Sequence, residues 1–542
     1  MRVPNSLSLI DSKQKKALQR LNVDNNKIMA GSIITISINK HSKEVSCCSS
    51  LQSMRFQSVE VYLLGTFYNL KGEVSTPDDL FELYQNHGTQ MYDALDGTGT
   101  AIIIDHLKKK VFAFTDFFNS IFPLFYGENS DELIITTHLL SLTAKMKGLT
   151  ISRFSAQEFM LHGMVYGRRT LISQVSKLPP KHYLEVDINR CKIHCRKCQY
   201  TIATISAVDT AAYNASFHKC MEECYKRGAG MTLSGGFDTN YILHHLQEIK
   251  QKEGDIGRIH AYCGGGSSGT DETPLAKEMA DYYGNIDLRT FHVTPGSIQN
   301  FPEIVLALQG VCFEDGIFLH YQLAKKFAED NIKYVYTGDL ADQVFNSETF
   351  QYSKPNYKRL ILMTLRGLKN AILYRRYDFY NWMFRGRYET AALKLLKKSG
   401  QMWDYFGAEG IYPYVRRPFL SVAKSTAKPG DYAKRFHRKV VLDTVAPFIA
   451  ERIQRRGGNT DPTALFDEKT KQVLRAEVMK MPWYKSRRFV NEDQQLGYEL
   501  RILYIDLVRR IFINQEFDRC RNGEYLLLKD IYPGFDINRC AD

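Results

Sequence analysis

Short runs of β-branched and aromatic residues follow one another through the first 200 residues of the chain. They include SIITISI, VEVYLLGTFYNL, GTAIIIDHLKKKVFAFTD and DELIITTH, with Gly, Asn, Asp and Lys between them. Runs of this length, bounded by turn-forming residues, are typical of strands. The pattern predicts a first part of the chain that is built mostly from β-sheet.

The pattern changes near residue 215, where apolar runs begin to alternate with amphipathic stretches. The strand-like runs GMTLS, RIHAYCG, DLRTFHV and KYVYTG are separated by the helix-like stretches DTNYILHHLQEIK, DETPLAKEMADYYG and FLHYQLAKKFAED. In the first of these stretches, Ile242, Leu243, Leu246 and Ile249 recur at helical spacing and predict one buried face. The alternation predicts βαβ units and a parallel sheet, with a domain boundary between residues 200 and 215 and a helical, basic C-terminal third.

Composition narrows the class of protein. A chain of 542 residues with 44% hydrophobic residues can bury large cores and should divide into two or more domains. It has no run close to 18 uninterrupted apolar residues, and its start lacks the apolar stretch of a secretory signal, so we expect a cytoplasmic protein without membrane contact. The 11 cysteines, an odd number, argue against a fully paired disulfide framework.

The net charge of +13 is concentrated in residues 351–440, which hold 20 Lys and Arg against 5 Asp and Glu. Such a segment is a solvated helical face or a surface that attracts an anion, which includes ATP phosphates, an acidic peptide, a partner protein or a nucleic acid. A dedicated nucleic-acid domain is not expected, because no paired zinc finger or aromatic RNA-binding motif accompanies the charge.

The stretch LSGGFDT, residues 233–239, has the parts of a phosphate site. It follows a strand and starts a helix, and Gly235 and Gly236 let the backbone approach a ligand. Asp238 would repel a phosphate unless a cation such as Mg²⁺ lies between them. The alternative is an ordinary strand-to-helix turn in which Ser and Asp are helix caps. The usual nucleotide loop is excluded, since no lysine follows the glycines.

LSGGFDT also resembles the S-G-G-x-D-[ST] pyrophosphate loop of the asparagine synthetase and β-lactam synthetase family, which activates a carboxylate as an acyl-adenylate. Four later segments resemble further motifs of that family in the same order. DETPLAKEMADYYG is similar to its acidic residue and A-x-x-[MV]-A helix, VYTGDLADQVF to S-G-E-G-A-D-E-[LV]-F, VRRPFLS to R-x-P-F-L-D, and FHRKVVLDTV to G-x-x-K-x-[LV]-L-R.

The first part of the chain resembles the glutaminase-type domain of the same family. GTFYNL, LDGTGTAIIID, DFFNSIFPLFY and SKLPPKHYLEV are similar to its motifs. One departure matters, because a working glutaminase needs an N-terminal cysteine nucleophile, whereas this chain begins Met1, Arg2, Val3. We therefore expect an inactive glutaminase-like domain.

The resemblance implies an α/β fold with two domains. Residues 1–208 would form a glutaminase-like (Ntn-type) αββα sandwich. Residues 209–542 would form a doubly wound parallel-sheet synthetase domain of the PP-loop ATP pyrophosphatase type with a helical C-terminal extension.

The resemblance also assigns roles to individual residues. Asp238 and Asp342 would bind Mg²⁺, Lys439 would contact phosphate and the developing oxyanion, and Asp339 would orient or deprotonate the reacting amine. The residues expected to bind ATP are Leu233, Ser234, Gly235, Gly236, Asp238, Thr239 and Gly338. Phe237 is expected to pack under the loop.

Two other motifs suggest different chemistry. GGGSSG, residues 264–269, satisfies the dinucleotide pattern G-x-G-x-x-G, but it follows the second strand and leaves residues 234–239 unexplained. Cys191, Cys195 and Cys198 have the spacing of radical iron–sulfur enzymes. They lie in a strand pair rich in Lys and Arg, which favours a coincidence over a cluster.

Without a glutaminase, the nucleophile is expected to be an amine of the substrate itself. The favoured function is an ATP-dependent ligase that closes a macrolactam in a ribosomally made precursor peptide, as the lasso-peptide cyclases do, with a leader-peptide-processing protease as a partner. The alternatives are a small-molecule amide or β-lactam synthetase and an asparagine synthetase-like enzyme that uses ammonia. From other classes come a non-catalytic scaffold and a nucleic-acid-binding protein.

Overall fold

The computed structural model describes most of the chain. The described residues are 33–49, 54–69, 71–116, 121–198, 202, 205, 208–265, 271–314, 316–345, 396–426, 434–445, 465–486, 488–516 and 526–535. Most of the basic segment 351–440 therefore lies outside the described residues. In the part of the chain that is described, no helix is long and apolar enough to cross a membrane.

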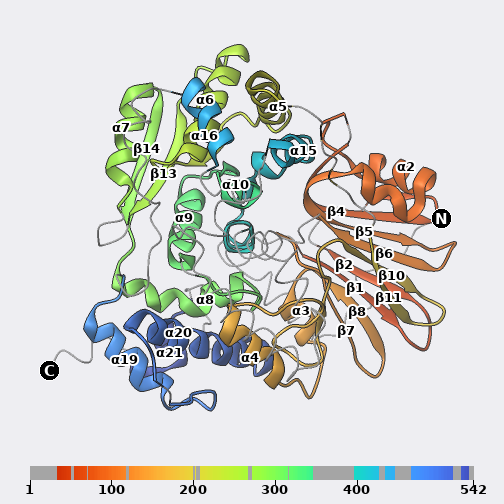
Figure 1. Ribbon diagram of the computed structural model, residues 1–542. Coiled ribbons are helices and arrows are strands. Elements are labelled where there is room, and N and C mark those ends of the chain that lie inside the picture. The colour runs from red at the N-terminus through yellow and green to blue at the C-terminus, as the bar shows by residue number, and fades with distance from the viewer. Residues whose placement is uncertain are drawn as a thin grey trace.

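Two antiparallel sheets make up the first part of the chain (Figure 1). The first has the order β2-β1-β8-β7-β9, with β1 (Ile34–Asn39), β2 (Val45–Ser49), β7 (Phe125–Glu128), β8 (Glu132–Thr136) and β9 (Ser176–Lys177). The second has the order β11-β10-β6-β5-β4-β3, with β3 (Met54–Phe56), β4 (Val59–Tyr68), β5 (Asp96–Asp105), β6 (Lys110–Thr115), β10 (His182–Asp187) and β11 (Lys192–Lys197).

Alternation along the strands explains how the sheets stack. Ile34, Ile36 and Ile38 of β1 share a buried cluster with Ile102 and Ile104 of β5, so the inner faces pack together. The outer face of the second sheet packs against α2 (Pro77–His87), and the outer face of the first against α3 (Leu139–Thr143) and α4 (Arg153–His162). The result is the helix–sheet–sheet–helix sandwich that the sequence predicts.

A parallel sheet in the order β14-β13-β12-β15-β16 organises the second part. Its strands are β12 (Gly230–Thr232), β13 (Ile259–Gly265), β14 (Ile286–His292), β15 (Tyr334–Tyr336) and β16 (Glu409–Ile411). Side chains of β13 and β15 enter a different buried cluster on each face, so helices cover both sides.

The helices on one face are α5 (Thr210–Glu223), α6 (Phe237–Lys252), α7 (Thr273–Tyr283), α15 (Arg417–Thr426) and α16 (Arg435–Thr444). Those on the other face are α8 (Phe301–Ala307), α9 (Ile317–Glu329) and α14 (Met402–Tyr405). The short helix α10 (Ala341–Val344) follows β15. This arrangement confirms the predicted doubly wound sheet.

Three C-terminal helices, α19 (Glu468–Val478), α20 (Glu492–Val508) and α21 (Leu528–Ile531), lie beneath both parts (Figure 1). The apolar side chains of α20 share one buried cluster with α4 and α8. Because core clusters run across both parts of the chain, the division at residue 208 stays a prediction.

Most predicted elements are found, with two differences. The three-residue strand β16 was not anticipated, since the sequence around it reads as helical. Gly264 and Gly265 of the GGGSSG motif belong to β13, where a side chain on Gly264 would collide with Leu319; residues 266–270 lie outside the described residues. The first two residues of that motif are therefore strand, and Gly264 packs against α9.

Candidate active site

The loops that follow β12 and β15 meet at one edge of the parallel sheet. These strands are neighbours, with Gly230 paired to Val335 and Met231 to Tyr336. Gly338 lies so close to the first loop that a Cβ atom there would be 3.2 Å from the Cβ of Asp238 and 3.1 Å from the Cγ2 of Thr239. Open parallel sheets bind ligands at this edge, beyond the carboxyl ends of the strands.

Hydrogen bonds within residues 234–240 fix the shape of the first loop. The Ser234 and Thr239 hydroxyls lie 3.0 Å apart, and the Ser234 hydroxyl accepts a bond from the amide of Gly236. Asn240 Nδ2 donates to the carbonyl of Gly236 over 2.6 Å. A Cβ atom on Gly235 would lie 2.5 Å from the Cβ of Leu275, so only glycine fits there. These contacts fix the conformation of the loop.

The first turn of α6 is free to bind an anion. Its N-cap residue is Gly236, and no side chain caps the helix. The Ser or Asp cap expected in the alternative is not formed among the described residues, and phosphate binding by the turn stays a prediction. An α-helix begins with amides that lack intrahelical partners, and its dipole adds positive potential there. The loop therefore fits a phosphate group.

Asp238 is held by two residues that sequence reasoning missed. Lys434 Nζ lies 2.7 Å from its Oδ2, and His437 Nε2 lies 2.9 Å from its Oδ1. Burial alone raises the pKa of this carboxyl, but the charge of Lys434 and the bond from His437 outweigh it and hold the pKa well below its usual range. Asp238 is therefore ionised at any physiological pH.

The hydrogen bonds also show where His437 carries a proton. Its Nδ1 lies 2.7 Å from the hydroxyl of Tyr213, and burial keeps the pKa of Tyr213 well above its usual value, so the phenol keeps its proton. On the other side, the ionised Asp238 carboxylate can only accept, so Nε2 of His437 carries a proton and donates to it. The stacked ring of Phe345, 4.4 Å away, fixes the plane of the imidazole.

Lys439, the lysine singled out from the sequence, lies on α16 with Lys434 and His437 but is exposed. Arg438 of the same helix packs over the ring of Phe237 at 4.8 Å, and Phe237 packs against the core as expected. The catalytic role of Lys439 stays a prediction. Lys434 is the N-cap residue of α16 and has left-handed backbone, so helical spacing gave no signal for its pairing with His437.

Asp339 occupies the second loop in a different environment. Burial raises the pKa of its carboxyl, against the opposing charge of Lys398 and a bond from Ser399. Its Oδ2 atom is buried without a hydrogen-bond partner among the described residues. An unpaired buried carboxylate oxygen is costly, so this atom fits a donor brought by a substrate.

Leu340 stands where the family motif has its second glycine, and it keeps a glycine-like backbone. Its φ angle is +74°, in the left-handed region that bulky residues avoid, while its side chain is buried. Strained backbone of this kind is found at sites where neighbouring structure dictates the conformation. Asp342 follows on α10, and its side chain lies outside the described residues.

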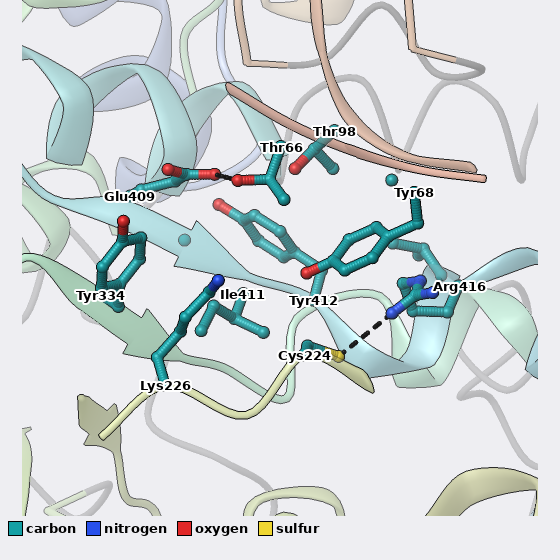
Figure 2. A pocket seen from close by; sticks show the side chains of 13 residues that line it. Thr66, Tyr68, Thr98, Cys224, Lys226, Tyr334, Glu409, Ile411, Tyr412 and Arg416 are labelled. Carbon is teal, nitrogen blue, oxygen red and sulfur yellow. Dashed lines mark hydrogen bonds between the residues drawn. The ribbon is translucent and has the colours of Figure 1, made fainter. Parts of the chain in front are cut away.

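Arg416 joins the two parts of the chain below this edge. Its guanidinium bonds to Asp96 at 2.6 Å and to Glu223 at 2.8 Å, and it lies 3.7 Å from the centre of the Tyr68 ring. The predicted motifs VRRPFLS, GTFYNL and LDGTGT therefore meet at one interface. Figure 2 shows the cavity beside Arg416, which has a volume of about 20 Å³, room for about one water molecule and far too small for a substrate.

Burial raises the pKa values of four thiols in the first part of the chain, and the expected loss of glutaminase activity stays a prediction. Burial raises the pKa of Cys47 and of Cys198 to about 12, and it also raises the pKa values of Cys48 and Cys195. A nucleophilic cysteine needs a lowered pKa. None of these four thiols is activated.

The three cysteines around β11 do not form a common site. Cys191 and Cys195 pack against the core between the sheets, whereas Cys198 is buried in the separate cluster beneath α2. Residues an odd number apart on a strand point to opposite faces. This distribution over two clusters does not favour a common iron–sulfur site, and the coincidence stays a prediction.

A parallel sheet with a glycine loop at its carboxyl edge, joined to an antiparallel sandwich, defines a two-part α/β protein. Residues 215–482 match the family described as asparagine synthase, and residues 69–199 match the glutamine amidotransferase domain. Residues 215–482 therefore belong to the asparagine synthase family. The two matches confirm the family resemblance found in the sequence.

The relatives that the chain is similar to include glutamine-hydrolysing asparagine synthetases of plants. It is 22% identical to that of Zea mays over 73% of this chain and 64% of the relative, and 23% identical to that of Asparagus officinalis over 68% and 58%. The chain thus spans less than two thirds of the length of these relatives. A Bacillus subtilis glutamine phosphoribosylpyrophosphate amidotransferase, 9% identical over 49% of this chain and 76% of that one, has a TM-score of 0.20, too low to support any inference.

Proposed function

We propose that this protein is an ATP-dependent, AMP-forming ligase that adenylates a carboxylate and lets an amine attack the acyl-adenylate. The observation that carries the proposal is the meeting of two loops at one sheet edge. One has an uncapped helix start beside Lys434, and the other has Asp339 with an unpaired carboxylate oxygen.

Each group has a role in that reaction. The amides at the start of α6 and the glycines of the loop bind the pyrophosphate of ATP, and Lys434 adds positive charge. Asp238 is ionised, and each of its oxygens keeps a lone pair beyond the bonds to Lys434 and His437, so its donor set fits Mg²⁺. Bound Mg²⁺ would neutralise charge on the leaving pyrophosphate. Asp342 is proposed as a second ligand.

The attacking amine must lose a proton as the amide forms. Asp339 is the proposed acceptor, because its raised pKa favours proton uptake and its Oδ2 has no other partner among the described residues. Lys439 is proposed to stabilise the oxyanion of the tetrahedral intermediate, which would bring its exposed side chain over the bound substrate.

We further propose that the amine belongs to the substrate and that the product is a macrolactam in a peptide. The raised thiol pKa values in the glutaminase-like part support an enzyme that does not draw ammonia from glutamine. The closely packed interface supports it as well, since Ile121 would lie 2.5 Å from a Cβ on Gly400. A partner protease that removes a leader peptide would act before ring closure.

A second candidate is an asparagine synthetase-like enzyme that uses free ammonia. The family match and the plant relatives favour it. Both candidates share the adenylation step and differ only in the amine.

The test is release of pyrophosphate from ATP against a panel of carboxylates and peptides. A peptide with a free N-terminal amine and an Asp or Glu side chain should give AMP, pyrophosphate and a product lighter by one water. Turnover only with aspartate and ammonia would support the second candidate. ATP cleavage to ADP, or none with any carboxylate, would contradict the ligase proposal itself.

A further inference from the structure

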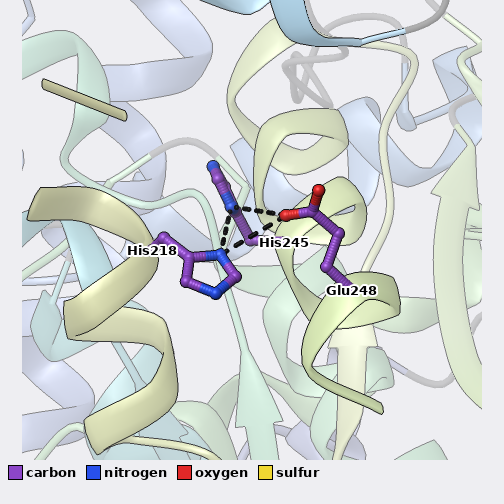
Figure 3. A group of neighbouring side chains, drawn as sticks. All are labelled: His218, His245 and Glu248. Carbon is purple, nitrogen blue, oxygen red and sulfur yellow. Dashed lines mark hydrogen bonds and ion pairs between the residues drawn. The ribbon is translucent and has the colours of Figure 1, made fainter. Parts of the chain in front are cut away.

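A cluster of three side chains lies on the outer side of α6, away from the loops. His218 of α5 faces His245 and Glu248 of α6, and Figure 3 shows one atom of each converging on a common point. His218 Nδ1 is 2.9 Å from His245 Nδ1, and each of these nitrogens is 3.4 Å from Glu248 Oε2.

These distances are close to those around a tetrahedral zinc ion. Bonds of about 2.0–2.1 Å to nitrogen and oxygen put neighbouring ligand atoms about 3.3–3.4 Å apart. The two nitrogen–oxygen separations match this spacing. A small rotation of one imidazole ring would lengthen the nitrogen–nitrogen separation of 2.9 Å to the same value. His245 and Glu248 are three residues apart on one helix, which places both ligands on the same face.

The surroundings supply what a metal-bound histidine needs. A ligating imidazole usually gives its second N–H to a carboxylate, and His218 Nε2 lies 3.4 Å from Glu222 Oε1, which Lys252 also binds at 2.6 Å. His245 is buried, and its Nε2 has no partner among the described residues. Glu248 is half exposed, which leaves room for water as a fourth ligand.

We propose that His218, His245 and Glu248 bind a zinc-class divalent cation that clamps α5 to α6. Two imidazoles and one carboxylate favour Zn²⁺, whereas Mg²⁺ prefers oxygen ligands. The site is distinct from the proposed Mg²⁺ position, since His245 is eight residues, or about 12 Å, along α6 from its first residue. A metal there holds the helix that carries the phosphate loop.

The test uses full-length protein without a histidine tag, loaded with Zn²⁺ and dialysed against metal-free buffer. Wild type should keep one Zn²⁺ per chain by mass spectrometry, and Co²⁺ should give the visible bands of a tetrahedral site. His218→Ala and Glu248→Gln should each weaken Zn²⁺ binding by more than about 100-fold, and Glu222→Gln by about 10- to 100-fold. Excess Mg²⁺ should not compete.

His260→Ala is the matched control, because that half-exposed histidine also pairs with a carboxylate, Asp287, but lies on β13 away from the cluster. It should keep wild-type affinity. Glu248→Gln changes a half-exposed side chain and should fold normally, with an unchanged melting temperature in chelator. No retained Zn²⁺ in wild type, or equal retention in His218→Ala and Glu248→Gln, would overturn the proposal. Neither result depends on ligase activity.

Discussion

Asp238 and Asp339 lie on adjacent loops of one sheet edge, yet their environments shift their pKa values in opposite directions. Lys434 and His437 hold the pKa of Asp238 well below its usual range, whereas burial raises the pKa of Asp339. Asp238 has both oxygens bonded, and Asp339 has one oxygen unpaired.

The opposite pKa shifts fit different roles for the two aspartates. A permanently ionised carboxylate can balance cations beside a phosphate. A carboxylate with a raised pKa can take and return a proton. Neighbouring titratable groups with divergent pKa values commonly divide acid–base and electrostatic roles in this way.

Asp238→Asn should have the largest effect. Removing the charge leaves Lys434 without its partner and removes a ligand for the proposed cation, so pyrophosphate release should fall by about 10³-fold. Asp255→Asn is a matched control, since Asp255 also has a lowered pKa, pairs with Lys250 at 2.6 Å and follows the far end of α6. Comparable loss in both variants would contradict the special role of Asp238.

Asp339→Asn should slow amide formation by about 10²-fold, the usual worth of a general base, while AMP transfer to the carboxylate continues. Rapid-quench measurement of the acyl-adenylate should show it accumulating. The wild-type rate should rise with pH through the ionisation of Asp339, and the variant should lose that limb. An unchanged pH profile would remove Asp339 from the proton transfer.

The same two acids should give opposite pH dependences of stability. A lowered pKa stabilises the fold above the unfolded value of 3.8 and loses that contribution as pH falls, so Asp238→Asn should lose stability relative to wild type as pH rises. A raised pKa has the opposite effect, because the carboxyl then destabilises the fold as pH rises above 3.8. Asp339→Asn should therefore become more stable relative to wild type as pH rises above that value. Urea unfolding between about pH 2.5 and 7, on both sides of the unfolded value of 3.8, measures both, and slopes of the same sign would refute the contrast.

Substitutions of Leu340 should have the smallest effect of those considered, and the effect is on the stability of the fold. Both Leu340→Ala and Leu340→Gly remove the buried side chain, but only glycine relieves a φ of +74°. The glycine variant should therefore be more stable than the alanine variant by about 1 kcal/mol in urea unfolding. Equal stabilities would mean that the backbone there is not strained.

The sequence predicts the strand–glycine–helix geometry of residues 230–240 well because its signals are contiguous. A strand, two glycines and a helix start lie within ten residues, and local sterics decide their conformation. The apolar runs likewise predict a strand-rich first part and a parallel sheet after it, since burial on one or two faces leaves a periodic signature. The stacking of the antiparallel sheets and the doubly wound order came from the family resemblance.

Contacts between residues that lie far apart in the chain could not be predicted from the sequence. Lys434 lies 196 residues from Asp238 and was one of many basic residues in its segment. His218 meets His245 only because α5 packs beside α6. The strand β16 has three residues with a central glycine, too few to show a period.

The central claim is that a carboxylate oxygen attacks the α-phosphorus of ATP at the Ser234–Thr239 loop. Turnover of a substrate whose carboxylate carries ¹⁸O tests it most directly. AMP should be recovered with one ¹⁸O atom, and Asp238→Asn should abolish the transfer. Label found in inorganic phosphate beside ADP, or AMP without label, would contradict the account.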